Sequence, residues 1–149
     1  VETKRAESSS RPFCLVMLDA DHFKRVNDTY GHKAGDDVLR TIAKLLSPSV
    51  RCPTDVPARL GGEEFAILLP DTRLQGAKVV CERIVGLLRD HGFRTDGHHF
   101  MVTVSMGLVE CRCETAETAL KLADENLYKA KTTGRDRIVA SLATPGAIA

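Results

Sequence analysis

The sequence has no tryptophan, and aromatic residues make up only 5% of its 149 positions. It also lacks an excess charge of either sign, because 21 Lys and Arg residues nearly balance 20 Asp and Glu residues, for a formal net charge of +1. A near-neutral chain has no overall field that attracts polyanions, so any anion must be bound by a few placed cations. We therefore expect a domain that contacts neither nucleic acid nor a membrane surface.

Long apolar runs are missing too: no stretch approaches the roughly 20 residues that span a bilayer, and no signal peptide opens the chain. The five cysteines are an odd set for disulfides and lack the spacing of a zinc site. Cys14 lies in an apolar run and Cys81 on the apolar side of an expected helix, so both are predicted core residues. These features indicate a reduced, cytoplasmic compartment, in a cytoplasmic protein or the cytoplasmic part of a membrane-anchored one.

Apolar periodicity divides the chain into strands and helices. It predicts a buried strand at 13–18, a helix from Asp36 to Pro48, a hairpin around Gly61-Gly62, a helix at 74–88, a strand at 100–108, a helix at 116–130 and a strand at 138–139. Residues 1–11 are expected to be a linker, 12–141 the domain and 142–149 a disordered tail. This order predicts an α+β fold, a central mostly antiparallel sheet flanked by helices, of the ferredoxin-like or polymerase-palm kind.

Acidic residues gather at two places in this order. Asp19 and Asp21 follow the first strand, and Glu63 and Glu64 follow the Gly-Gly pair of the hairpin. Carboxylates together with substrate phosphates are the ligands that Mg²⁺ prefers, and paired metals serve nucleotidyl transfer. For Asp21 alone, a structural role at the strand end is the better interpretation. For Asp19 with Glu63 a metal site is favoured, because a carboxylate beside a buried strand is costly without a partner.

Four motifs occur in the order of one known family. The string Arg59-Leu60-Gly61-Gly62-Glu63-Glu64-Phe65 matches the GG(D/E)EF signature, and residues 19–28 (DADHFKRVND) match D-x-D-x-F-K-x-x-N-D. Residues 30–36 (YGHKAGD) and 123–135 (ADENLYKAKTTGR) match the G-H-x-x-G-D and A-D-x-x-L-Y-x-A-K-x-x-G-R segments. From Phe13 to Val139 the chain resembles the GGDEF domain of diguanylate cyclases.

The resemblance implies a site residue by residue. Asp19, Glu63 and the Ala20 carbonyl would bind metal, two Mg²⁺ or Mn²⁺ ions per active site. Backbone amides near His22 and Phe23 would hold phosphates, as oriented N–H groups do in anion nests, and Gly62 would let the backbone approach the ligand. The residues that would neutralise the triphosphate are Lys24, Lys131 and Arg135.

Several of these residues have a second interpretation. Asn27 and Asp36 would read guanine, and the wrong base would leave buried groups unpaired; Asp36 can also cap the helix that it opens. Lys131 and Arg135 can also complement a helix dipole. Three roles are open for Glu64: general base, auxiliary metal ligand, or structural residue of the motif.

The function implied is the condensation of two GTP molecules into cyclic di-GMP, with release of two pyrophosphates, by a transient homodimer. An N-terminal sensory or regulatory domain is expected in the full-length protein. The alternative from another class is a non-catalytic sensor of GTP or cyclic di-GMP, which the intact acids disfavour. An adenylate cyclase or polymerase palm shares the metal chemistry, but Asn27, Asp36 and the Gly-Gly turn point away from it.

The sequence departs from the family at the inhibitory site. Many diguanylate cyclases carry an R-x-x-D motif whose aspartate lies five residues before the glycines. Asp55 occupies that place, but Cys52 stands where the arginine belongs, and Arg51 lies one residue too early. One residue shifts the reach of the chain by about 3.3–3.6 Å, so we predict weakened product inhibition.

Overall fold

The structure is a computed structural model that describes residues 11–49 and 56–143. A five-stranded sheet has the order β2-β3-β1-β6-β7. Its strands are β1 (Phe13–Ala20), β2 (Val56–Gly61), β3 (Glu64–Pro70), β6 (Val104–Cys111) and β7 (Ile138–Leu142). Neighbouring strands are antiparallel except for the parallel pair β6 and β7. The predicted α+β fold with a mostly antiparallel sheet is confirmed.

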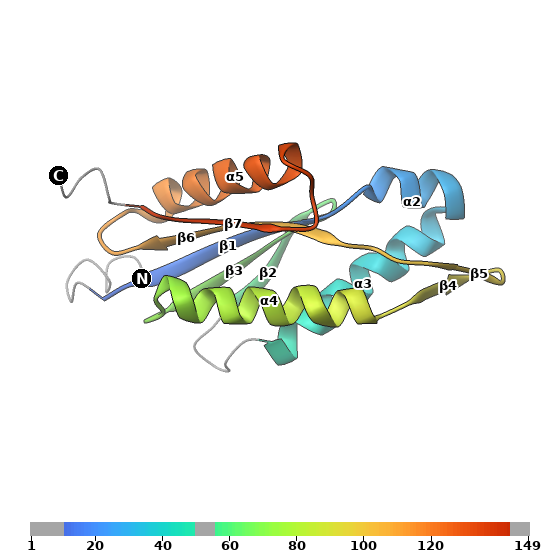
Figure 1. Cartoon of the computed structure of the whole chain (residues 1–149), viewed down its shortest axis with the longest axis horizontal. Coiled ribbons are helices and arrows are strands. Elements are labelled where there is room, and N and C mark those ends of the chain that lie inside the picture. Colours follow the sequence, from blue (N-terminus) through green and yellow to red (C-terminus); the bar gives the residue numbers. More distant parts are fainter. Residues whose placement is uncertain (1–10, 50–55, 144–149) are drawn as a thin grey trace.

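Helices cover both faces of this sheet (Figure 1). The helices α3 (His32–Ser49) and α4 (Leu74–Asp90) lie on one face, and α5 (Ala116–Thr132) lies on the other. The short helix α2 (Phe23–Tyr30) follows β1 directly. None of the helices in the two described ranges combines the length and apolarity that a bilayer crossing requires.

The elements differ from the predicted ones in three places. Helix α2 was not predicted, because its eight residues are fewer than the span over which apolar periodicity identifies a helix. Helix α3 begins at His32 rather than Asp36, and it runs to Ser49, one residue past Pro48. The strand expected at 100–108 is two strands, β5 (His98–Phe100) and β6, and β5 pairs with β4 (Phe93–Thr95).

Aromatic stacking explains why that strand is interrupted. The Phe100 ring lies 4.3 Å from the Tyr30 ring and 5.4 Å from the Phe93 ring, centroid to centroid. Phe100 therefore packs in the β4–β5 hairpin rather than in the main sheet. At the other end of the chain, β7 reaches Leu142, one residue into the expected tail. The boundaries of the linker and the tail stay predictions.

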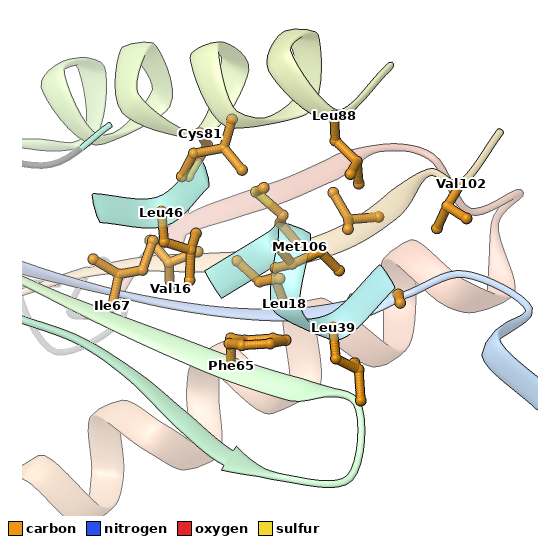
Figure 2. Close-up of a cluster of buried hydrophobic side chains, with 14 of the residues drawn as sticks. Val16, Leu18, Leu39, Leu46, Phe65, Ile67, Cys81, Leu88, Val102 and Met106 are labelled. Carbon is orange, nitrogen blue, oxygen red and sulfur yellow. The ribbon is translucent and has the colours of Figure 1, made fainter. Parts of the chain in front are cut away.

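Strand β1 supplies side chains to two cores. Cys14, Val16 and Leu18 point toward α3 and α4, and Figure 2 shows Val16 and Leu18 in that core with Cys81 of α4. The alternate residues of β1 pack against α5 in the second core: Phe13, Leu15 and Met17. The prediction that Cys14 and Cys81 are core residues is confirmed.

Helix α5 approaches the sheet unusually closely at Gly107 of β6. A Cβ atom at Gly107 would lie 2.1 Å from the Ala123 carbonyl oxygen and 2.3 Å from the Leu127 amide nitrogen. Both of these atoms belong to the backbone of α5, so no side chain can rotate to make room. The absence of a side chain at Gly107 therefore sets how near α5 lies to β1 and β6.

We predict that Gly107→Ala destabilises the fold by about 3 kcal/mol, because the added methyl group must push a whole helix off the sheet. The free energy of unfolding, measured by chemical denaturation, checks this. Gly86→Ala in α4 is the matched control, since a Cβ there meets no atom within 4 Å. That variant should gain about 0.4–1 kcal/mol. Equal stabilities for the two variants would contradict the close approach.

Candidate active site

The α5-facing side of β1 changes from apolar to acidic along the strand. Phe13, Leu15 and Met17 face α5, and Asp19 follows in the same alternation. The matching side of α5 ends in Lys131, which forms an ion pair with Asp19 through Nζ and Oδ2. The second core thus ends in an ion pair between strand and helix, in which Asp19 is buried and Lys131 is partly exposed.

The hairpin of β2 and β3 brings a second acid to this place. Asp19 is the cross-strand partner of Glu64, and Glu63 lies in the turn directly before it. The backbone carbonyl of Gly62 accepts two hydrogen bonds from Arg59, at 3.2 Å from Nε and 2.7 Å from Nη2. The turn is further shaped by positive φ angles of 142° at Gly61 and 51° at Gly62. Arg59 thereby fixes the tip of the hairpin that carries Glu63.

A cavity of about 470 Å³ opens at this end of the sheet. It combines acidic residues from β1 and the hairpin with cationic residues from α2 and from the end of α5. The residues that line it are Asp19, Ala20, Asp21, His22, Phe23, Lys24, Arg25, Asp28, Glu63, Lys131 and Arg135. Eight of the predicted site residues meet in this one cavity.

Two of the acids in the cavity, Asp19 and Glu63, lose solvent to different degrees: Asp19 is buried and Glu63 is half-buried. Asp19 is only 4% exposed, and its Oδ1 atom is buried without a hydrogen-bond partner. Burial raises the pKa of Asp19, although the hydrogen bond and charge of Lys131 act in the opposite direction. Burial and then the nearby charge of Asp19 raise the pKa of Glu63. A buried carboxyl group with an unpaired oxygen and a half-buried one beside it are an arrangement that a cation would stabilise.

These residues fit a magnesium-type site that the substrate completes. Within the described residues no group of three or more His, Cys, Asp and Glu side chains could hold a metal. Mg²⁺ commonly takes only one or two carboxylates and completes its shell with phosphate oxygens and water. Asp19, Glu63 and the backbone of Ala20, which all line the cavity, match that donor set.

The cationic side chains of the same cavity suit an anion. Lys24, Lys131 and Arg135 all line it. Helix α2 begins there at His22, whose φ is 55°, and no side chain caps the first turn of the helix. Uncapped N–H groups at a helix N-terminus bind anions, and the helix dipole adds to the attraction.

Four predicted site residues lie outside this cavity. The Asn27 side chain lies over the backbone of Gly35, where a Cβ atom would be 1.9 Å from Asn27 Oδ1. Asp36, the next residue, lines a second cavity of about 270 Å³ together with Leu39, Arg40, Ala43 and Arg59. Gly62 and Glu64 belong to the hairpin. The inhibitory pair, Arg51 and Asp55, lies outside the described residues.

Sequence reasoning missed Arg25 and Asp28, which line the main cavity beside the predicted residues of α2. The sequence signal was there, because both lie in the matched segment 19–28. Asp21 was interpreted as structural, and its oxygens do accept hydrogen bonds from Thr103 and Ser105 of the protein itself.

Comparison with known proteins agrees with this geometry. The model of the family described as "Diguanylate cyclase, GGDEF domain" matches residues 1–137. The chain belongs to this family. The GGDEF domain is 41% identical over 146 residues to the probable diguanylate cyclase DgcT of Escherichia coli, covering 90% of this chain and 30% of DgcT. It is 41% identical over 144 residues to the response regulator PleD of Caulobacter vibrioides, covering 94% and 32%. The domain thus spans about a third of the length of these relatives.

Solved structures are similar as well. The GGDEF domain of DgcB from Caulobacter crescentus, in complex with c-di-GMP, has a TM-score of 0.89 at 33% identity, covering 93% of this chain and 83% of that one. Diguanylate cyclase SiaD from Pseudomonas aeruginosa, in complex with its activator SiaC, also has a TM-score of 0.89, at 42% identity and with 94% and 54% covered. Diguanylate cyclases of this family depend on metal.

We predict that Glu63→Gln raises the thermal midpoint of the metal-free domain at neutral pH. Because the pKa of Glu63 is raised in the folded domain, its ionised form lowers the free energy of unfolding. This loss shrinks as the pH falls through the folded-state pKa, and it is gone below the pKa of an unfolded glutamate, about 4.3. The gain should therefore vanish near pH 4. Thermal unfolding with a chelator, across that pH range, measures it.

Added Mg²⁺ provides the second arm of this test. It should stabilise the wild-type domain more than the Glu63→Gln variant, because the variant has lost a ligand. A variant that is less stable than wild type at neutral pH without metal would contradict the desolvation of Glu63.

Proposed function

We propose that this GGDEF domain is the catalytic domain of a diguanylate cyclase, condensing two GTP molecules into cyclic di-GMP with release of two pyrophosphates. The observation that carries the proposal is the meeting of Asp19, with its unpaired Oδ1, and Glu63 in one cavity with Lys24, Lys131 and Arg135. Carboxylates for metal and cations for phosphate are the two requirements of nucleotidyl transfer.

Each residue of the site has a part in the reaction. Asp19, Glu63 and the Ala20 carbonyl would hold two Mg²⁺ or Mn²⁺ ions, which supply Lewis-acid stabilisation of the phosphate and a lower pKa for the attacking hydroxyl. The amides at His22 and Phe23 and the cations of Lys24, Lys131 and Arg135 hold the β- and γ-phosphates and stabilise the leaving pyrophosphate. Glu64 pairs with Asp19 between β3 and β1, and this pairing supports a role as general base or auxiliary ligand beside a structural role in the motif.

Base recognition falls to the neighbouring α2–α3 region. Asn27 and Asp36 present an amide and a carboxylate at the junction of α2 and α3, and the cavity beside Asp36 is lined by Leu39 and Arg59. A carboxylate accepts hydrogen bonds from N1–H and the 2-amino group of guanine, a pattern that adenine does not offer. Gly62 lets the ligand approach the hairpin backbone.

Among the described residues, Asp19 and Glu63 form one candidate metal site beside one set of phosphate cations, so one domain would accommodate one GTP. The 3′-hydroxyl of a second GTP must reach the first α-phosphate, and a second domain related by two-fold symmetry supplies it. The catalytic unit is therefore a transient homodimer of cytoplasmic domains. An N-terminal sensory or regulatory domain would bring two copies together, as the greater length of the relatives suggests. The intact acids Asp19, Glu63 and Glu64 favour this function over a non-catalytic sensor.

Incubation with GTP and Mg²⁺ tests the function directly. We predict that mass spectrometry detects cyclic di-GMP, with two pyrophosphates released for each cyclic di-GMP formed. The yield of cyclic di-GMP per domain should rise with protein concentration, because only dimers react. Glu63→Gln should form no product while its thermal unfolding stays cooperative. An inactive wild-type domain at all concentrations, or full turnover by a proven monomer, would contradict the mechanism.

A second experiment tests base choice. Asn27→Ala or Asp36→Ala should weaken GTP binding by about 0.5–3 kcal/mol, since each removes a hydrogen bond to the base edge. ATP binding should change far less. Calorimetric titration with both nucleotides measures the difference, and Lys24→Ala is the control that should weaken both equally. Equal losses for GTP and ATP in the Asn27 and Asp36 variants would remove these residues from base recognition.

A further inference from the structure

The turn between α5 and β7 holds an uncommon backbone conformation. Gly134, Arg135 and Asp136 follow one another with φ angles of 131°, 61° and 47°. For residues other than glycine this region is disfavoured, and two in succession persist only where the surroundings hold them. Arg135, in the middle of this turn, lines the main cavity. The conformation of the turn therefore decides where the Arg135 guanidinium lies.

Two hydrogen bonds between backbone groups and one from a backbone amide to a side chain hold the turn. The Arg135 amide donates to the Ala130 carbonyl at 2.9 Å, and the Met106 amide donates to the Arg137 carbonyl at 2.9 Å. The third donor, the Asp136 amide, donates to Oδ2 of Asp21 at 2.9 Å. Asp21 is 115 positions away in the sequence and 5% exposed. A buried carboxylate at the end of β1 thus holds the turn that carries Arg135.

Asp21 is itself fixed from the side of β6. Its Oδ1 accepts a hydrogen bond from Ser105 Oγ at 2.6 Å, and its Oδ2 accepts one from Thr103 Oγ1 at 2.6 Å. Its backbone amide donates to the Thr103 carbonyl at 2.8 Å. Both carboxylate oxygens are therefore engaged by the protein, whereas Asp19 keeps Oδ1 without a partner. This contrast separates the two aspartates: Asp19 is available to a metal, and Asp21 is not.

We propose that Asp21 is a positioning residue that acts through Arg135. By holding the Asp136 amide it keeps the left-handed turn in place, and the turn aims the Arg135 guanidinium at the triphosphate in the cavity. The identity of this ligand rests on the proposed function. The role of Asp21 in the turn rests only on the hydrogen bonds given above.

The proposal predicts different effects for two substitutions of Asp21. Asp21→Ala removes all the acceptors and should weaken GTP binding about tenfold, as expected for loss of a charged hydrogen bond to phosphate. In Asp21→Asn the amide oxygen can still accept hydrogen bonds from Thr103 Oγ1 and from the Asp136 amide. The new NH₂ group can donate to Ser105 Oγ, because the serine hydroxyl can rotate and act as an acceptor. This variant should therefore bind GTP within about twofold of wild type. A metal ligand would not tolerate this amide, so a loss in Asp21→Asn as large as in Glu63→Gln would overturn the proposal.

A double-mutant cycle tests whether Asp21 acts through Arg135. Binding of a fluorescently labelled GTP with Mg²⁺ is measured for Asp21→Ala in wild-type, Arg135→Ala and Lys24→Ala backgrounds. The effect of Asp21→Ala should disappear when Arg135 is already alanine. It should persist in the Lys24→Ala background, since Lys24 lines the same cavity from α2. An undiminished effect in the Arg135→Ala background would overturn the coupling.

Hydrogen exchange of the Asp136 amide, followed by NMR, tests the anchor without any nucleotide. Protection should fall in Asp21→Ala and remain in Asp21→Asn; unchanged protection in Asp21→Ala would overturn the proposal. If the wild-type domain binds no GTP but Asp21→Ala still lowers the protection of this amide, the proposed function and the ligand named here would be overturned, whereas the role of Asp21 in the turn would stand. If Asp21→Ala fails to fold, Gly134→Ala serves in its place, because a Cβ there is strained at φ 131° and would lie 2.3 Å from Nη2 of Arg137, at the end of the same turn. It too should weaken GTP binding about tenfold, and only while Arg135 is present.

Discussion

The close approach of α5 to β6 at Gly107 is the constraint on which the rest of the site depends. With no Cβ between them, the backbones of helix and strand are in contact, and the last turn of α5 lies over the end of β1. Lys131 then meets Asp19, and the turn after α5 places Arg135 in the same cavity. A helix held further from the sheet would move Lys131 and Arg135 away from Asp19.

The site is built at a cost to the stability of the fold. Burial raises the pKa of both Asp19 and Glu63, so their ionised forms are less favourable in the folded domain than in water. Lys131 offsets part of this for Asp19, but Oδ1 remains without a partner. Groups left unsatisfied in this way are common at functional sites, where a ligand completes them. A cation bound between Asp19 and Glu63 would remove much of this cost.

The sequence alone predicted the elements with strong periodicity and the residues within motifs. It predicted the hairpin, α4 and α5, because alternation and helical spacing are local signals. The expectation that Asp19 and Glu63 share a site came instead from the cost of an unpartnered carboxylate and from the motifs. Sequence reasoning missed α2, which has only eight residues, and the break before β6, which depends on the stacking of Phe100 on Tyr30. The network around Asp21 joins residues more than 80 positions apart, so no local pattern could reveal it.

Arg59 joins two parts of the molecule that perform different tasks. Its guanidinium closes the turn that presents Glu63, and its side chain also borders the cavity that begins at Asp36. One side chain therefore borders both the hairpin turn and the cavity beside α3. Any replacement at this position has to satisfy both neighbours at once, so a change made to reshape the cavity beside Asp36 would also alter the support of the turn that carries Glu63.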